Sequence, residues 1–196
     1  MSLNMAVNWS GPALLLGAHP HGGNLSMDWW LNFLRIVHIG SAMAWFGGAI
    51  VSSFFLAPTA QALGAAGQPF MDHLVRRRIG IYFPVVSALT ILSGAALYWR
   101  ASNGLDGAWI GSGPGLAFTI GGLAALAAFI GGAVLIGPSI GERTAVQSEL
   151  AASGGEPTET QRQRLARAEG KMRLANRLDL PLLLLAGLTM AVARYL

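Results

Sequence analysis

His38 is the residue in this chain whose type and position most clearly indicate chemistry. It lies within the apolar segment from Leu31 to Ile50 and is the only histidine placed where lipid would surround the chain. Ionisable groups at membrane depth are costly and usually face a bundle interior, where they hold an ion, a proton or a cofactor. Arg35 lies on the same helical face, roughly 4.5 Å nearer the start of the helix. The pair predicts a ligand with a cationic group beside it; the alternative is that His38 only hydrogen-bonds a neighbouring helix.

A neutral imidazole is a good ligand for haem iron, copper or zinc, so the surroundings of His38 indicate which group fits. On the same helical stripe, small residues alternate with Trp45 and leave room for a flat macrocycle, and Arg35 could pair with a propionate. Arg100 and Arg194 end two other apolar segments on the same side. We therefore expect a haem site with three guanidinium groups around one outer cavity. Ordinary snorkelling is the alternative for Arg100 and Arg194.

A second axial ligand cannot be histidine or lysine, because neither occurs elsewhere in an apolar segment. Met190 is the candidate. It lies about 9 Å from the outer end of the last helix, against about 12 Å for His38 on the first, at 1.5 Å per residue. Core packing is the alternative for this methionine. Thr90 and Tyr98 could supply polar contacts.

The polar N-terminal segment contains a second possible metal site. His19 and His21 flank a proline and could bind Cu(II) or Zn(II), with His38 as a further copper ligand. A histidine pair of this kind in a polar tail is usually only a loop, and no methionine stripe continues a copper path across the bilayer. Copper is therefore the alternative cofactor to haem.

The composition indicates a membrane protein. Of the 196 residues, 53% are hydrophobic and 11% charged, whereas about a quarter of a soluble domain is charged. Four stretches are long enough to cross about 30 Å of hydrocarbon as helices. They lie at about 29–56, 79–99, 115–136 and 178–196. Pro58 follows the end of the first stretch, and Gly137-Pro138 is expected to end the third. The expected fold is all-α, a bundle of four transmembrane helices.

Basic residues predict the orientation of this bundle. They cluster at Arg76-Arg77-Arg78, between the first two helices, and in the stretch 139–176 between the last two. The positive-inside rule makes both segments cytoplasmic and both termini external, with residues 1–28 an outer segment ahead of a membrane domain, 29–196. Tryptophans near the outer boundary support this topology. The net charge of +4 thus reflects orientation in a lipid bilayer rather than nucleic-acid binding.

The stretch 139–176 is the one sizeable polar region, and its sequence predicts a helical hairpin. Gly154-Gly155-Glu156-Pro157 is a turn signal that divides it into two arms. Thr158 and Gln161 have capping-box spacing, so a second arm is expected to begin there and to run directly into the last transmembrane helix. The mixed charges indicate a solvated surface, with docking of a partner or binding of anionic lipid as the alternative.

These patterns resemble the copper resistance D (CopD) family of small bacterial four-helix membrane proteins. The similar residues are Arg35-Ile-Val-His38 with Ala44-Trp45-Phe46-Gly47-Gly48, Arg76-Arg77-Arg78, Leu92-Ser93-Gly94-Ala95-Ala96-Leu97-Tyr98 and Met190-Ala-Val-Ala-Arg194-Tyr195. The resemblance covers most of the chain from about Trp29 onward and implies a multi-pass protein of the bacterial inner membrane. Related HemJ-type protoporphyrinogen oxidases hold b-type haem on a first-helix histidine, which His38 matches. Their third-helix lysine has no counterpart in 115–136.

Three functions follow as hypotheses, and whether the protein is an enzyme stays open. The first is a membrane protein that holds b-type haem on His38 for electron transfer or for support of an oxidoreductase complex. The second is copper transport or resistance through His38, His19 and His21. The third is a non-catalytic subunit or assembly factor of a membrane-protein complex or homo-oligomer. Its docking face would be the small-residue stripe Ala124, Ala128 and Gly132.

Overall fold

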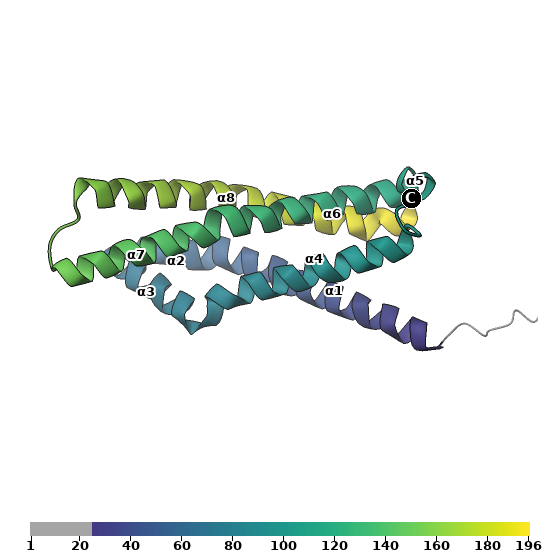
Figure 1. Ribbon diagram of the computed structural model, residues 1–196, viewed down its shortest axis with the longest axis horizontal. Helices are drawn as coiled ribbons and strands as arrows, with labels where there is room; N and C mark the ends of the chain where they lie inside the picture. The colour runs from purple at the N-terminus through teal and green to yellow at the C-terminus, as the bar shows by residue number, and fades with distance from the viewer. Residues whose placement is uncertain (1–24) are drawn as a thin grey trace, which may run out of the picture.

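The computed structural model describes residues 25–196, and this part of the chain is all-α, without a strand. Four long helical runs extend along the same axis, and each is long and apolar enough to cross a membrane (Figure 1). They are α1 (Leu25–Val51) with η1 (Ser52–Leu56) and α2 (Ala57–Ala62); α4 (Gly80–Ala101); α6 (Gly113–Gly131) with η4 (Gly132–Ile136) and α7 (Gly137–Ser153); and α8 (Glu159–Val192) with η5 (Ala193–Tyr195). The expected four-helix membrane bundle is confirmed.

Short elements join these runs at the two ends of the bundle (Figure 1). Between α2 and α4 lie η2 (Gly64–Ala66), α3 (Gly67–Leu74) and η3 (Val75–Ile79), and between α4 and α6 lies the single-turn helix α5 (Gly107–Ile110). The chain enters α4 through Arg78, whose φ of 75° lies in the left-handed region. This conformation produces the sharp corner at the start of α4.

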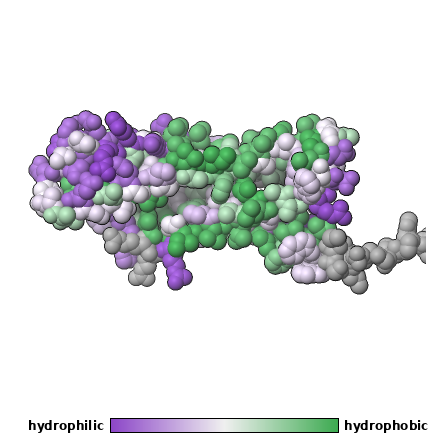
Figure 2. All heavy atoms as spheres, in the orientation of Figure 1, coloured by the Kyte–Doolittle hydropathy of each residue, from purple (hydrophilic) through white to green (hydrophobic). Residues whose placement is uncertain are grey.

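The outward faces of the helices are strongly apolar. Ile36, Met43 and Leu92 are each about 70% exposed, and Figure 2 shows an apolar band between two more polar ends. Exposed apolar surface of this extent is unfavourable in water but matches the interior of a bilayer. The structure therefore supports a multi-pass membrane protein surrounded by lipid.

Small residues allow the closest approaches between helices. α6 packs most extensively against α8, and α1 against α4. A Cβ on Gly121 of α6 would lie 2.6 Å from the hydroxyl of Thr189 on α8, so only glycine permits this approach. Without a hydrophobic driving force between helices in lipid, such close backbone contact is a main source of association.

The small-residue stripe of the third transmembrane helix lies inside this chain, which corrects one expectation. Ala124 and Ala128 are 6% and 3% exposed, because they pack in the bundle's own core. Ala128 contacts the cluster formed with Trp45, Ala49 and Leu183. The proposal that this stripe is a docking face for another protein is therefore wrong for these two alanines.

The third helix does not end at Gly137-Pro138, contrary to expectation, but continues from α6 through η4 into α7. Proline lacks an N–H donor and its ring clashes with the carbonyl four residues earlier, which for Pro138 is that of Val134. The π-helical turn η4 widens the helix at this carbonyl and accommodates the ring. The turn η1 has the same relation to Pro58, where α1 continues into α2.

The polar hairpin forms as predicted, from α7 and the first half of α8 (Figure 1). Gly154 ends α7 with a φ of 64°, and Thr158 and Gln161 form the expected capping box at the start of α8. Arg164 of α8 bonds the carboxylates of Glu142 and Glu149 on α7, the latter at 2.8 Å. Hydrogen bonds from Gln161 and Arg164 hold the pKa of the Glu149 carboxyl below its usual value.

Trp45→Ala should destabilise the fold by about 3–5 kcal/mol, because it leaves a cavity where α1, α6 and α8 meet. The measurement is thermal unfolding of the detergent-solubilised protein. Trp29→Ala is the matched control, since this side chain is 60% exposed and its loss should change stability little. Equal effects of the two substitutions would contradict the assignment of Trp45 to the core.

Candidate functional site

His38 lies at the interface of α1 and α4, where its ring is fixed by one backbone contact. Its Nδ1 is 2.9 Å from the carbonyl oxygen of Thr90. A carbonyl oxygen can only accept, so Nδ1 carries the hydrogen and donates it. In the neutral ring, Nε2 then carries the lone pair, which is the arrangement found in metal-ligating histidines whose other nitrogen is bound to a backbone carbonyl.

The Nε2 atom of His38 has no hydrogen-bond partner among the residues that the structure describes. The ring as a whole is half-buried. In the described part of the chain, every fully buried side-chain nitrogen or oxygen has a hydrogen-bond partner. Because Nε2 of His38 has none, it is not among the fully buried atoms. Nε2 therefore has no protein partner among these residues and is not fully buried, while Nδ1 is held by the Thr90 carbonyl.

A small polar cluster surrounds the fixed side of the ring. The Thr90 hydroxyl lies 2.9 Å from the Ser41 hydroxyl across the α1–α4 interface, and the Ser93 hydroxyl lies 3.4 Å from Nδ1 of His38. The three side chains are at most 8% exposed, and each also bonds a carbonyl one turn earlier in its own helix. The cluster holds α1 and α4 in one register without leaving a polar group unsatisfied.

Gly94 lets the imidazole lie directly against α4. A Cβ at this position would be 2.7 Å from Cε1 of His38 and 3.1 Å from its Nδ1. Real Cβ atoms do not approach other atoms this closely, so any other residue at position 94 would displace the ring from the Thr90 carbonyl. The observed orientation of His38 therefore requires glycine at position 94.

Met190 lies at the depth expected for a second ligand. Trp45 of α1 and Leu183 of α8 belong to one buried cluster. Relative to Trp45 and Leu183, His38 and Met190 are each seven residues nearer the end of the bundle at which α1 begins and α8 ends, which is about 10.5 Å and nearly two full turns. Both side chains thus continue the inward faces of α1 and α8, His38 against Gly94 of α4 and Met190 against Gly121 of α6.

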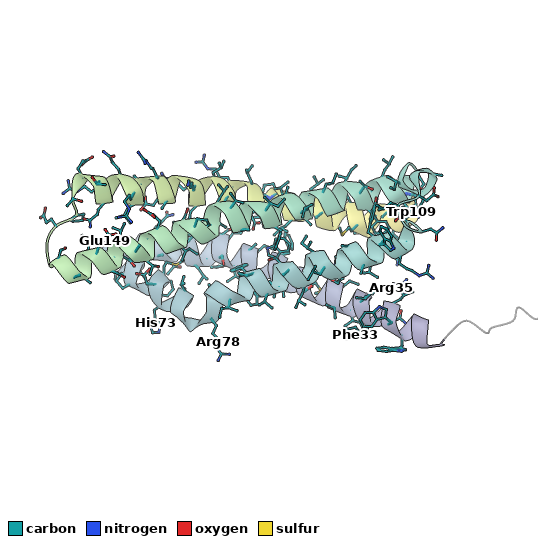
Figure 3. The ribbon with its side chains drawn as sticks, in the orientation of Figure 1. Phe33, Arg35, His73, Arg78, Trp109 and Glu149 are labelled. Carbon is teal, nitrogen blue, oxygen red and sulfur yellow. The ribbon has the colours of Figure 1, made fainter. Side chains whose placement is uncertain are left out.

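Trp45 and the three arginines occupy different parts of this region. Trp45 is 5% exposed and fills the bundle core two turns from His38. The three arginines are exposed. Arg100 and Arg194 lie where α4 and α8 end, at the same end of the bundle (Figure 1), and Arg35 lies in the first half of α1 (Figure 3). Arg35 bonds Asn32 at 3.1 Å, and Arg194 bonds and stacks on Tyr195. Arg100 lines a hollow of about 220 Å³ with Trp99, Asn103 and Gly104.

The remaining candidates are separate from this region. Tyr98 does not face His38; its hydroxyl is 2.6 Å from that of Thr119 and ties α4 to α6. His19 and His21 lie outside the described residues. Among residues 25–196, no three histidine, cysteine or acidic side chains gather in the manner of a metal site. His38 offers a single imidazole, and Met190 packs against Gly121 of α6.

Three residues of the site were not identified as such by the sequence. Ser41, Ser93 and Gly94 act through short contacts that depend on how α1 crosses α4. The available signal was the set of small and polar residues on one face of two otherwise apolar helices, a pattern typical of transmembrane helix contacts. Thr90 was expected to make a polar contact, and its carbonyl makes the one that orients the ring.

Comparison with family models, curated proteins and solved structures gave no match to this chain.

Gly94→Ala should displace the His38 ring and break its bond to the Thr90 carbonyl, at a stability cost of about 1–3 kcal/mol from overpacking. Thermal unfolding measures the cost, and ¹⁵N NMR of histidine-labelled protein measures the tautomer. Gly40→Ala on α1 is the control, because a Cβ there meets nothing within 4 Å. An unchanged His38 spectrum in Gly94→Ala would refute the described geometry.

Proposed function

We propose that this chain is a membrane protein that holds one b-type haem through Nε2 of His38. Its role is electron transfer within the bacterial inner membrane or support of an oxidoreductase complex there. The observation that carries the proposal is the contact of Nδ1 with the Thr90 carbonyl, which assigns the hydrogen to Nδ1 and leaves Nε2 with a lone pair and no described protein partner. When bound, haem supplies one-electron redox chemistry.

The residues around His38 fit one axial ligand. The Thr90 carbonyl accepts the Nδ1 hydrogen, and the absence of a side chain at Gly94 lets the ring pack against α4. The Ser41 hydroxyl lies within hydrogen-bonding distance of that of Thr90, and the Ser93 hydroxyl lies beside Nδ1. A ligand that is oriented in advance loses little freedom on binding. The absence of a described protein partner for Nε2 supports coordination as the role of this ring, in addition to the hydrogen bond made by Nδ1.

Met190 is the proposed second ligand, because it continues the inward face of α8 at the depth of His38. The thioether sulfur is a known axial ligand of haem and raises its reduction potential. Trp45 and its neighbours close the inner end of the site with a packed apolar layer. Arg35, Arg100 and Arg194 at the outer end are suited to pair with propionates.

The proposed orientation places the α7–α8 hairpin in the cytoplasm and both termini outside. The hairpin end carries most of the basic residues, and the opposite end carries exposed aromatic side chains, including Trp29, Trp99 and Tyr195. Basic residues are retained on the cytoplasmic side, and tryptophan and tyrosine favour the interface.

His38→Ala should abolish haem binding, because it removes the only imidazole in the described transmembrane helices. The measurement is the Soret absorption of protein purified from haem-supplied cells. His73→Ala is the control, since this exposed residue lies on α3 at the far end of the bundle (Figure 3). A wild-type protein without a Soret band, or a band that survives His38→Ala, would rule the proposal out.

Met190→Leu should keep haem on the protein but lower its reduction potential and convert six-coordinate iron to five-coordinate, since the thioether is lost while volume is conserved. Absorption spectroscopy and potentiometric titration measure both changes. Met43→Leu is the matched control, because Met43 is 70% exposed. If the two variants behave alike, Met190 is a packing residue and not a ligand.

A further inference from the structure

The α7–α8 hairpin contains a hollow that the haem proposal does not use. It has a volume of about 260 Å³ and lies between the two arms. Its lining residues come from the start of α7 and from the facing part of α8: Pro138, Ser139, Glu142, Arg164, Arg167, Ala168 and Lys171. Three of these side chains are cationic and one is a carboxylate, so the lining carries an excess of positive charge.

Small, buried residues form the floor of this hollow. Ser139 and Ala168 are each 2% exposed, and the Ser139 hydroxyl donates to the carbonyl of Leu135 at 2.6 Å. The hydroxyl hydrogen is thus already used within the helix. Donors for a bound group must therefore come from the cationic side chains at the rim.

The cations form one stripe on α8. Arg164, Arg167 and Lys171 are spaced by three and four residues and share the face turned toward α7. Arg164 pairs with both Glu142 and Glu149, so its positive charge is already used within the hairpin. Among the side chains that the structure describes, no carboxylate lies within ion-pairing distance of Arg167 or Lys171. Like charges one turn apart repel, and an anion in the hollow would remove this repulsion.

The position of the hollow indicates where its ligand comes from. It begins at Pro138, directly after the apolar run of α6 and η4, in which Val134 is 60% exposed. In Figure 2 the polar end of the molecule borders the apolar band. The hollow thus directly follows the apolar run along α7, and basic residues beside an apolar run can recognise anionic lipid headgroups.

We propose that this hollow is a binding site for a phosphate group, held by Arg167 and Lys171 with Arg164 fixed beside them. The phosphate belongs either to the headgroup of an anionic lipid or to a soluble phosphate compound. Guanidinium and ammonium groups together provide the charge-assisted N–H donors that a phosphate's oxygens accept. The site is independent of His38 and of haem, and its test does not depend on them.

The test measures thermal shifts of the full-length protein in neutral detergent. Short-chain phosphatidylglycerol, short-chain phosphatidylcholine and inorganic phosphate are titrated separately. We expect saturable stabilisation by phosphatidylglycerol, by inorganic phosphate or by both, and none by phosphatidylcholine. A shift with the lipid alone identifies a headgroup site, and a shift with inorganic phosphate alone identifies a soluble ligand. No shift with either anion overturns the proposal.

Two double variants that remove the same positive charge from opposite faces of α8 distinguish binding in the hollow from nonspecific electrostatic attraction. R167Q/K171Q should weaken binding roughly 30-fold, and K171Q alone about five-fold, from the usual contribution of one basic residue near a lipid surface. R162Q/R173Q removes the same charge from the opposite face of α8, where the pairs Arg162–Glu156 and Arg173–Glu169 are exposed. It should change affinity less than about three-fold. Equal losses in the two double variants would overturn the proposal.

Discussion

The hydrogen bond from Nδ1 of His38 to the Thr90 carbonyl is the interaction on which the site depends. In a bilayer no water replaces a missing partner, so this hydrogen must be satisfied inside the protein. The Thr90 carbonyl has two lone pairs and can serve both its own helix and the imidazole. The bond therefore joins α1 to α4 and fixes the ring, while Nε2 stays without a described protein partner. The Thr90 carbonyl can keep its backbone hydrogen bond within α4.

Hydropathy and capping signals were sufficient to predict most of the fold. Four apolar stretches specified four transmembrane helices, and the Thr158–Gln161 capping box located the second arm of the hairpin. The continuation of α6 through Pro138 was missed, because a proline after an apolar run usually ends a helix. At Pro138 the helix continues with a widened π-helical turn before the proline. The small and aliphatic residues of η4 do not distinguish such a turn from an ordinary α-helical one.

The candidate site was predicted unevenly. A single ionisable ring in an apolar segment identified His38. Its orientation depends on a backbone carbonyl of Thr90 and on the missing side chain of Gly94, and neither feature has a chemical signature in the sequence. The alanine stripe of α6 was interpreted as an outer face, although it lies in the core. Sequence periodicity identifies a close-packing face, but not the helix that covers it.

The π-helical turn η4 has a consequence for the relation between membrane and hairpin. Each such turn contains one residue more than an α-helical turn, and that residue rotates everything after it by about 100°. The face that α7 turns toward α8 is therefore rotated by about 100° from the face that an uninterrupted α-helix would present there. A chain without the inserted residue would turn Glu142 and Glu149 away from Arg164 while leaving the transmembrane contacts in place.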